Sequence, residues 1–124
     1  MFELIPSDNL GLNYDPSHPY LLMIDYVKPV YDFKDKIFHM HIKDLKILKD
    51  KLDEYGIWSY PGLWHAPKLP GLGGINFGAL VSALNEVGFD GYACIEIEDR
   101  AFERCPEDVK SGIEQSYRYM IQYM

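Results

Sequence analysis

The sequence predicts an α/β fold in which short β-strands alternate with α-helices. Two observations support it: short segments rich in β-branched or aromatic residues, and apolar residues at helical spacing between and after them. The chain has 124 residues, of which 48% are hydrophobic and 25% are charged, a composition typical of one folded domain. Strands that alternate with helices favour parallel pairing through right-handed crossovers.

The first strand is predicted over residues 9–14, which mix apolar and polar side chains and end where prolines appear. Asp15 then stands at the carboxyl end of this strand. A short helix is expected over residues 20–26 and another over 29–35, because each follows or includes a proline suited to a first helical turn. These elements form the first β-α unit.

The clearest strand prediction covers residues 36–42, which are rich in β-branched and aromatic side chains. Residues 44–74 follow without a clear periodic pattern, and a loop of this length is usually functional or disordered. A lysine-rich run, residues 43–51, leads into this segment and is interpreted as solvated and partly extended. Alternation along the strand gives one face with His39, His41 and Lys43, and an opposite face with Phe38, Met40 and Ile42.

Two further helices and one strand complete the predicted order β-α-β-α-β-α. Apolar spacing predicts a helix over residues 77–87, with Asn76 as its N-cap and Gly88 just beyond its end. Residues 91–98 are predicted to form the third strand, which ends in acidic residues. The last helix begins at Pro106, and its apolar stripe comprises Val109, Ile113, Tyr117, Met120, Ile121 and Met124.

Charge and cysteine content limit the partners and the compartment of the chain. Twelve Lys and Arg residues against nineteen Asp and Glu residues give a net charge of −7, which disfavours nucleic acid as a partner. No apolar stretch approaches the roughly 20 residues of a membrane span, and the first residues lack the pattern of a signal peptide. The two cysteines form no disulfide framework. We therefore expect a cytoplasmic protein without a membrane partner.

Ionisable residues gather at the predicted carboxyl ends of the strands, where parallel α/β folds bind ligands. Asp15, His41 and Glu96 offer oxygen and imidazole donors of the kind that hold Mn, Mg, Co or Zn. Each also has a structural interpretation, as a turn carboxylate, a packed histidine and a solvated strand end. Glu96 is the strongest clue, since it lies within an otherwise apolar predicted strand, where an unpaired carboxylate is costly to bury.

Five short motifs follow one another at residues 13–18, 37–44, 70–77, 88–91 and 95–99. Together, in this order, they resemble the xylose-isomerase-like sugar phosphate isomerase/epimerase family. That family folds as a (β/α)8 TIM barrel, and the resemblance implies that residues 1–124 are its carboxyl-terminal part, a partial barrel with strands six to eight and their helices.

The resemblance also assigns roles to residues of this chain. It implies that Asp15, His41 and Glu96 are metal ligands on strands six, seven and eight, and that Glu96 takes part in proton transfer. His18 corresponds to a histidine that contacts the substrate. Lys68 stands where many members of the family have an arginine, and is the second candidate for substrate binding.

The activity implied by the resemblance is a divalent-metal-dependent isomerisation or epimerisation of a sugar or sugar phosphate, by proton transfer through an enediolate. A complete barrel takes roughly 250 residues, so we expect a truncated chain that lacks strand five and its glutamate ligand. A homo-oligomer formed through the open barrel edges is another expectation. The alternative function is a non-catalytic barrel fragment that binds metal weakly or serves as an interaction module. A metal-dependent endonuclease is disfavoured by the charge of −7.

Overall fold

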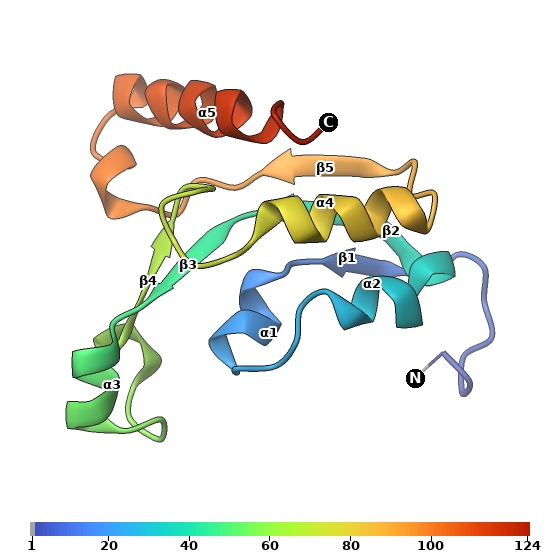
Figure 1. Ribbon diagram of the computed structural model, residues 1–124, viewed down its shortest axis with the longest axis horizontal. Coiled ribbons are helices and arrows are strands. Elements are labelled where there is room, and N and C mark those ends of the chain that lie inside the picture. The colour runs from blue at the N-terminus through green and yellow to red at the C-terminus, as the bar shows by residue number, and fades with distance from the viewer. Residues whose placement is uncertain (1) are drawn as a thin grey trace.

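A sheet of three parallel strands is the centre of the computed structural model, which describes residues 2–124. Its strands are β1 (Leu12–Tyr14), β2 (Ile37–Ile42) and β5 (Tyr92–Ile95), and they lie in the order β1-β2-β5 (Figure 1). β2 pairs in parallel with both neighbours. Parallel pairing requires a crossover between consecutive strands, and helices supply it here. The predicted α/β class and the existence of the three strands are confirmed, although β1 begins three residues later than predicted and β5 ends three residues earlier.

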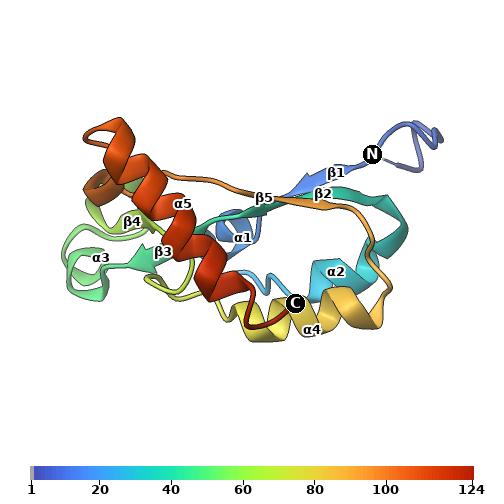
Figure 2. The ribbon, with the colours of Figure 1, turned by 90° about the horizontal axis from the view of Figure 1, so that it is seen from above.

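Helices connect the strands and follow the last one. In chain order they include α1 (Ser17–Leu21), α2 (Lys28–Asp32), α4 (Phe77–Glu86) and α5 (Pro106–Met120), with the 3-10 turns η1 (Lys34–Lys36) and η3 (Arg100–Phe102). Figure 2 shows α2 and α4 together on one side of the sheet. No helix formed by residues 2–124 is both long and apolar enough to span a membrane.

The core lies between the sheet and α4. Met40 and Ile42 of β2 are buried against Phe77, Leu80 and Leu84 of the helix. The helix begins and ends as predicted: the Asn76 side chain accepts a hydrogen bond from the N–H of Ala79, and Gly88 has a φ of 70° beyond the last turn. One face of β2 therefore packs on the core, and the other face is left for polar residues.

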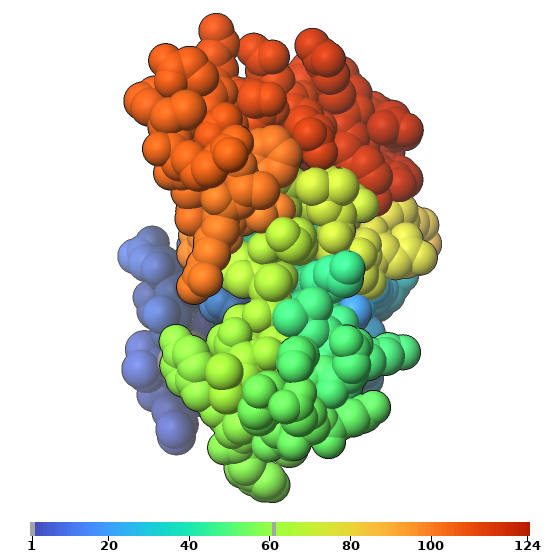
Figure 3. Space-filling model, turned by 90° about the vertical axis from the view of Figure 1, so that its left-hand side faces the viewer, coloured from blue at the N-terminus to red at the C-terminus, as the bar shows by residue number. Residues whose placement is uncertain are grey.

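The long loop predicted over residues 44–74 is wrong, because much of this segment folds into a hairpin. β3 (Asp44–Ile47) pairs antiparallel with β4 (His65–Lys68), and α3 (Lys49–Tyr55) and the 3-10 turn η2 (Pro61–Leu63) lie between them. Figure 3 looks onto the carboxyl ends of the parallel strands, where this hairpin (green) covers the centre of the face. Proline and glycine are rare in strands, so their presence in this segment argued against the two strands that pair in the structure.

Two other predictions near the sheet need correction. The first helix is not at residues 20–26 but earlier, because Asp15 accepts a hydrogen bond from the N–H of Ser17 and the chain turns at Met23, whose φ is 58°. Phe38 does not share the burial of Met40, because Phe38 is 46% exposed. The register between β1 and β2 shifts beside Leu12, and such a bulge interrupts the alternation of faces.

Most of the apolar stripe predicted for α5 does not pack, although Met120 of that stripe is buried. Gly112, Ser116 and Met120 are the buried residues of this helix, whereas Ile113 and Tyr117 are exposed. A Cβ atom added to Gly112 would lie 3.3 Å from the side chain of Phe102, so a small residue allows this close approach. Small side chains thus let the helix pack closely against the turn that contains Phe102, and most of its apolar stripe faces outward.

Candidate metal centre

Asp15, His41 and Glu96 come together at the carboxyl end of the parallel sheet. Each follows or ends a different strand, and each offers one ligand atom within 4.8 Å of the others. The register explains the meeting, because His41 pairs with Cys94, and the N–H of Glu96 extends the ladder by donating to the carbonyl of Ile42 at 3.2 Å. The sequence prediction that these three side chains share one edge is therefore matched by the geometry.

The imidazole of His41 lies between the two carboxylates. Its Nδ1 atom is 3.4 Å from Oε2 of Glu96 and 3.9 Å from Oδ2 of Asp15. Asp15 is 5% exposed, and its Oδ1 atom is fixed by the N–H of Ser17 at 2.8 Å. The first turn of α1 thus holds one carboxylate oxygen and leaves the other directed at His41.

The opposite nitrogen of the imidazole is held by a residue that the sequence analysis did not select. The side-chain amide of Asn13, on β1, is hydrogen bonded to Nε2 of His41 at 3.0 Å. Residues that bind metals are commonly oriented by such a partner behind them. The position of Asn13 two residues before Asp15, on the same face of the strand, is the signal that could have identified it.

Lys43 is the second residue that the sequence analysis missed. Its ammonium lies 3.1 Å from Oδ2 of Asp15, 3.0 Å from Oε2 of Glu96 and 3.1 Å from Oε2 of Glu98. The residue is 7% exposed, so its interpretation as part of a solvated lysine run is wrong. Alternation along β2 placed Lys43 on the face of His41, and that pattern should have outweighed the charge run.

Oδ2 of Asp15 and Oε2 of Glu96 are buried, and neither accepts a hydrogen bond from any residue in 2–124. Lys43 approaches both oxygens closely, but as an ion pair and not in hydrogen-bond geometry. Buried carboxylate oxygens are costly unless a cation neutralises them, and within the described residues Lys43 is that cation. Two such oxygens beside an imidazole nitrogen form a donor set that suits a divalent metal ion.

His18 and Lys68, the predicted substrate-binding residues, lie at different distances from this centre. Nε2 of His18 is 3.5 Å from Oδ2 of Asp15, and its side chain is 72% exposed. Lys68, on β4, instead donates a hydrogen bond to Oδ1 of Asp99 at 2.9 Å. Burial alone would raise the pKa of Asp99, but the hydrogen bonds from Lys68 and from the N–H of Ala101 hold this pKa below its usual value. The charge of Lys68 is therefore already paired.

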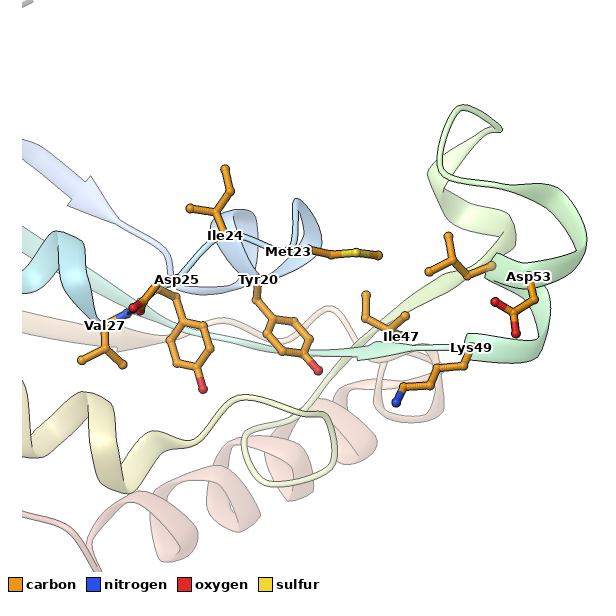
Figure 4. Close-up of a pocket in the computed structure, with 10 residues that line it drawn as sticks. Tyr20, Met23, Ile24, Asp25, Val27, Ile47, Lys49 and Asp53 are labelled. Atoms are coloured by element: carbon orange, nitrogen blue, oxygen red, sulfur yellow. Dashed lines mark hydrogen bonds between the residues drawn. The ribbon is translucent and has the colours of Figure 1, made fainter.

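Two hollows lie near the carboxyl end of the sheet. One, of about 660 Å³, is lined by Lys68, His65 and Glu98, and Glu98 also contacts Lys43 of the central cluster. The other, of about 670 Å³, lies between the segment after α1 and the start of the hairpin, and its lining includes Tyr20, Ile24 and Ile47 (Figure 4). Glu98 thus lies between the first hollow and the candidate metal centre, although none of the three candidate ligands lines that hollow.

A model of a known protein family matches nearly the whole chain. The family is the xylose isomerase-like TIM barrel, and the match covers residues 1–123. The chain belongs to this family. Membership explains why the parallel strands, the crossover helices and the polar carboxyl edge occur together, since TIM barrels place their sites on that edge.

Solved structures show the same xylose isomerase-like fold. A xylose isomerase domain protein from Planctomyces limnophilus is 20% identical, with a TM-score of 0.68 over 98% of this chain and 42% of that one. The IolI protein, solved with a bound zinc atom, is 21% identical, with a TM-score of 0.72 over 98% of this chain and 41% of that one. No curated protein matches. The chain therefore has the fold of part of a TIM barrel and spans less than half the length of these structures.

Proposed function

We propose that this chain carries strands six to eight of a divalent-metal-dependent sugar isomerase or epimerase. In this proposal Asp15, His41 and Glu96 hold the metal ion. The observation that carries it is the pair of buried carboxylate oxygens, one from Asp15 and one from Glu96, that accept no hydrogen bond within residues 2–124 and face the same imidazole. Membership in the xylose isomerase-like family and the zinc atom in the IolI structure support it.

The proposed chemistry divides between the bound ion and the residues around it. A divalent ion held there would act as a Lewis acid on the oxygens of a sugar. Glu96 is the candidate base, because its carboxylate reaches the site from the end of β5 and is only partly buried. The exposed imidazole of His18 stands beside Asp15 and is placed to hydrogen bond with a sugar hydroxyl.

The rest of the catalytic machinery is proposed to come from barrel strands outside this chain. The resemblance implies a further glutamate ligand on strand five, and the solved relatives are more than twice as long as the part that matches. Lys68 borders the hollow beside Glu98 and is the candidate contact for the far end of the substrate. Phosphorylated and unphosphorylated sugars both remain within this proposal.

The test is metal-dependent stability of the purified chain, followed by calorimetry. Mn²⁺ at a hundredfold excess over its dissociation constant should stabilise the parent by about 3 kcal/mol. His41→Ala should lose this gain, since it removes the nitrogen between the two carboxylates. His39→Ala is the matched control, because His39 lies two residues before His41 on β2 and is not one of the three candidate ligands. Equal metal responses in the parent and His41→Ala would reject the proposed site.

A second candidate function is an interaction module, favoured by the apolar side chains at one sheet edge and on α5. Tyr92, at the start of β5, is 82% exposed, and Ile113 and Tyr117 are exposed on the last helix. An edge strand offers unpaired backbone groups to another chain. The metal-response test separates the two functions, because an interaction module alone predicts no effect of His41→Ala on metal-dependent stability.

A further inference from the structure

The ammonium of Lys43 occupies the centre of the acidic cluster that the proposed metal would enter. It is the point where three carboxylates meet, since it lies 3.0 to 3.1 Å from one oxygen each of Asp15, Glu96 and Glu98. Two of those oxygens, from Asp15 and Glu96, belong to residues of the candidate ligand set. The lysine and the metal therefore compete for the same negative charge.

The charge on Lys43 is permanent under ordinary conditions. A lysine ammonium is charged at neutral pH, and here carboxylate oxygens of Asp15, Glu96 and Glu98 surround it within 3.1 Å. A lysine is a compact charge on a flexible stem, so its ammonium can move while its backbone stays in place. Glu98 is the partner to which it can retreat, because Glu98 is the most exposed of the three carboxylates and is not part of the candidate ligand set.

We propose that Lys43 is a built-in cation that holds Asp15 and Glu96 together in the metal-free chain, and that metal entry moves its ammonium onto Glu98. This inference rests on the proposed function, because it assumes that a metal binds Asp15, His41 and Glu96. Lys43 is a positioning residue in this scheme and is not a ligand. It keeps the ligand carboxylates assembled without metal, and in return it weakens metal affinity.

Two consequences separate this role from a purely structural one. Replacing Lys43 with an apolar residue of similar length should destabilise the metal-free chain, because it leaves three carboxylates without their cation. The same replacement should strengthen metal binding, since a positive charge no longer opposes a divalent ion across a few ångströms. A lysine that merely supported the fold would, when removed, weaken both stability and metal binding.

The experiment compares Lys43→Met with Lys46→Met, an exposed lysine of β3 that serves as the control. Isothermal titration with Mn²⁺ and melts of the metal-free protein are recorded for each. We expect the Mn²⁺ dissociation constant of Lys43→Met to fall at least about tenfold, and its metal-free melting temperature to fall below that of Lys46→Met. An unchanged or weaker affinity in Lys43→Met, while the parent binds Mn²⁺, overturns the inference and leaves the proposed function standing.

A second variant keeps the inference testable if Lys43→Met does not fold without metal. Glu98→Gln alters a half-exposed side chain and removes the negative charge onto which the ammonium of Lys43 would move. We expect it to weaken Mn²⁺ binding several-fold in the parent background, and an unchanged affinity would count against the inference. Absence of Mn²⁺ binding in the parent, Lys43→Met and Glu98→Gln alike would instead reject the proposed function. The metal-free melts would then still decide whether Lys43 holds the carboxylates together.

Discussion

The backbone N–H of Gly73 donates a hydrogen bond to Oδ2 of Asp44 at 2.9 Å, although 29 residues separate the two in the chain. Asp44 is fully buried, and it also accepts from the N–H groups of Gly71, Ile75 and Leu45. A Cβ atom on Gly73 would overlap the Asp44 carboxylate, so this position requires glycine. The glycine-rich turn before α4 thus wraps around a carboxylate of the protein itself.

Asp44→Asn should destabilise the fold strongly. The amide group replaces one carboxylate oxygen with a donor, and because each oxygen accepts two hydrogen bonds, two N–H groups lose their partner at about 1–3 kcal/mol each. We expect the free energy of unfolding to fall by roughly 2–4 kcal/mol, measured by urea denaturation. Asp53→Asn, on the exposed side of α3, is the control. Equal denaturation midpoints for the two variants would contradict this assignment.

Asn13→Ala should weaken metal binding without removing a ligand. An imidazole that coordinates through Nδ1 carries its proton on Nε2, and a half-turn of the Asn13 amide would present its oxygen to that proton. Loss of such a partner costs roughly tenfold or more in metal affinity. Titration calorimetry with Mn²⁺ checks this, with Asn85→Ala on the exposed side of α4 as the control. Matching affinities in both variants would show that Asn13 does not orient His41.

The raised pKa of Tyr14 predicts that the free energy of unfolding falls at alkaline pH. Burial, with the nearby charges of Asp25 and Asp15, raises the pKa of Tyr14 from its usual 10.0 to about 12. The unfolded chain therefore ionises this phenol first, so its contribution to stability is complete below about pH 10 and is lost as the pH rises toward 12. Denaturation midpoints between pH 9 and 12 should fall less steeply in Tyr14→Phe.

Tyr60→Phe provides the control for the alkaline series, because the Tyr60 ring is largely exposed. Part of the slope should survive in Tyr14→Phe, since the hydrogen bond with Tyr123, and then burial, raise the pKa of Tyr119 to about 12 as well. If Tyr14→Phe and the parent lose stability in parallel over this range, the phenol of Tyr14 does not contribute as described.

The open edge of β5 predicts self-association of the purified chain. Tyr92 is 82% exposed at this edge, and lysine at an edge strand discourages pairing with another copy. We expect sedimentation velocity to show a mass that increases with concentration in the parent, and a shift toward monomer in Tyr92→Lys. Tyr60→Lys, in the hairpin, changes the charge equally at another exposed tyrosine. A concentration-independent monomer in the parent would rule this out.

The main elements and the central cluster were predictable because they follow local patterns. Apolar spacing and end signals located α4, and strand ends in a parallel fold brought Asp15, His41 and Glu96 to one edge. These signals need only a few neighbouring residues and one topological rule. They are strongest where the chain is most regular.

The features that sequence analysis missed depend on contacts between distant residues. The hairpin of β3 and β4 forms from segments whose prolines and lysines have no strand pattern of their own. Lys43 looked like the first member of a solvated run, and only its three carboxylate partners show otherwise. The outward stripe of α5 was misassigned because small residues, such as Gly112, determined the packing face instead of large apolar ones.

Lys43 and Asp44 are consecutive in the chain, yet the first contacts the acidic cluster and the second anchors the glycine-rich turn. Side chains of neighbouring residues in extended backbone point to opposite sides. Inserting or deleting one residue here would therefore turn the side chain of Lys43 toward the glycine-rich turn and that of Asp44 toward the acidic cluster. An ammonium would then face backbone N–H groups, and a fourth carboxylate would join the cluster. Changes of length among related sequences should therefore fall at the hairpin tip, where Trp58 is 99% exposed.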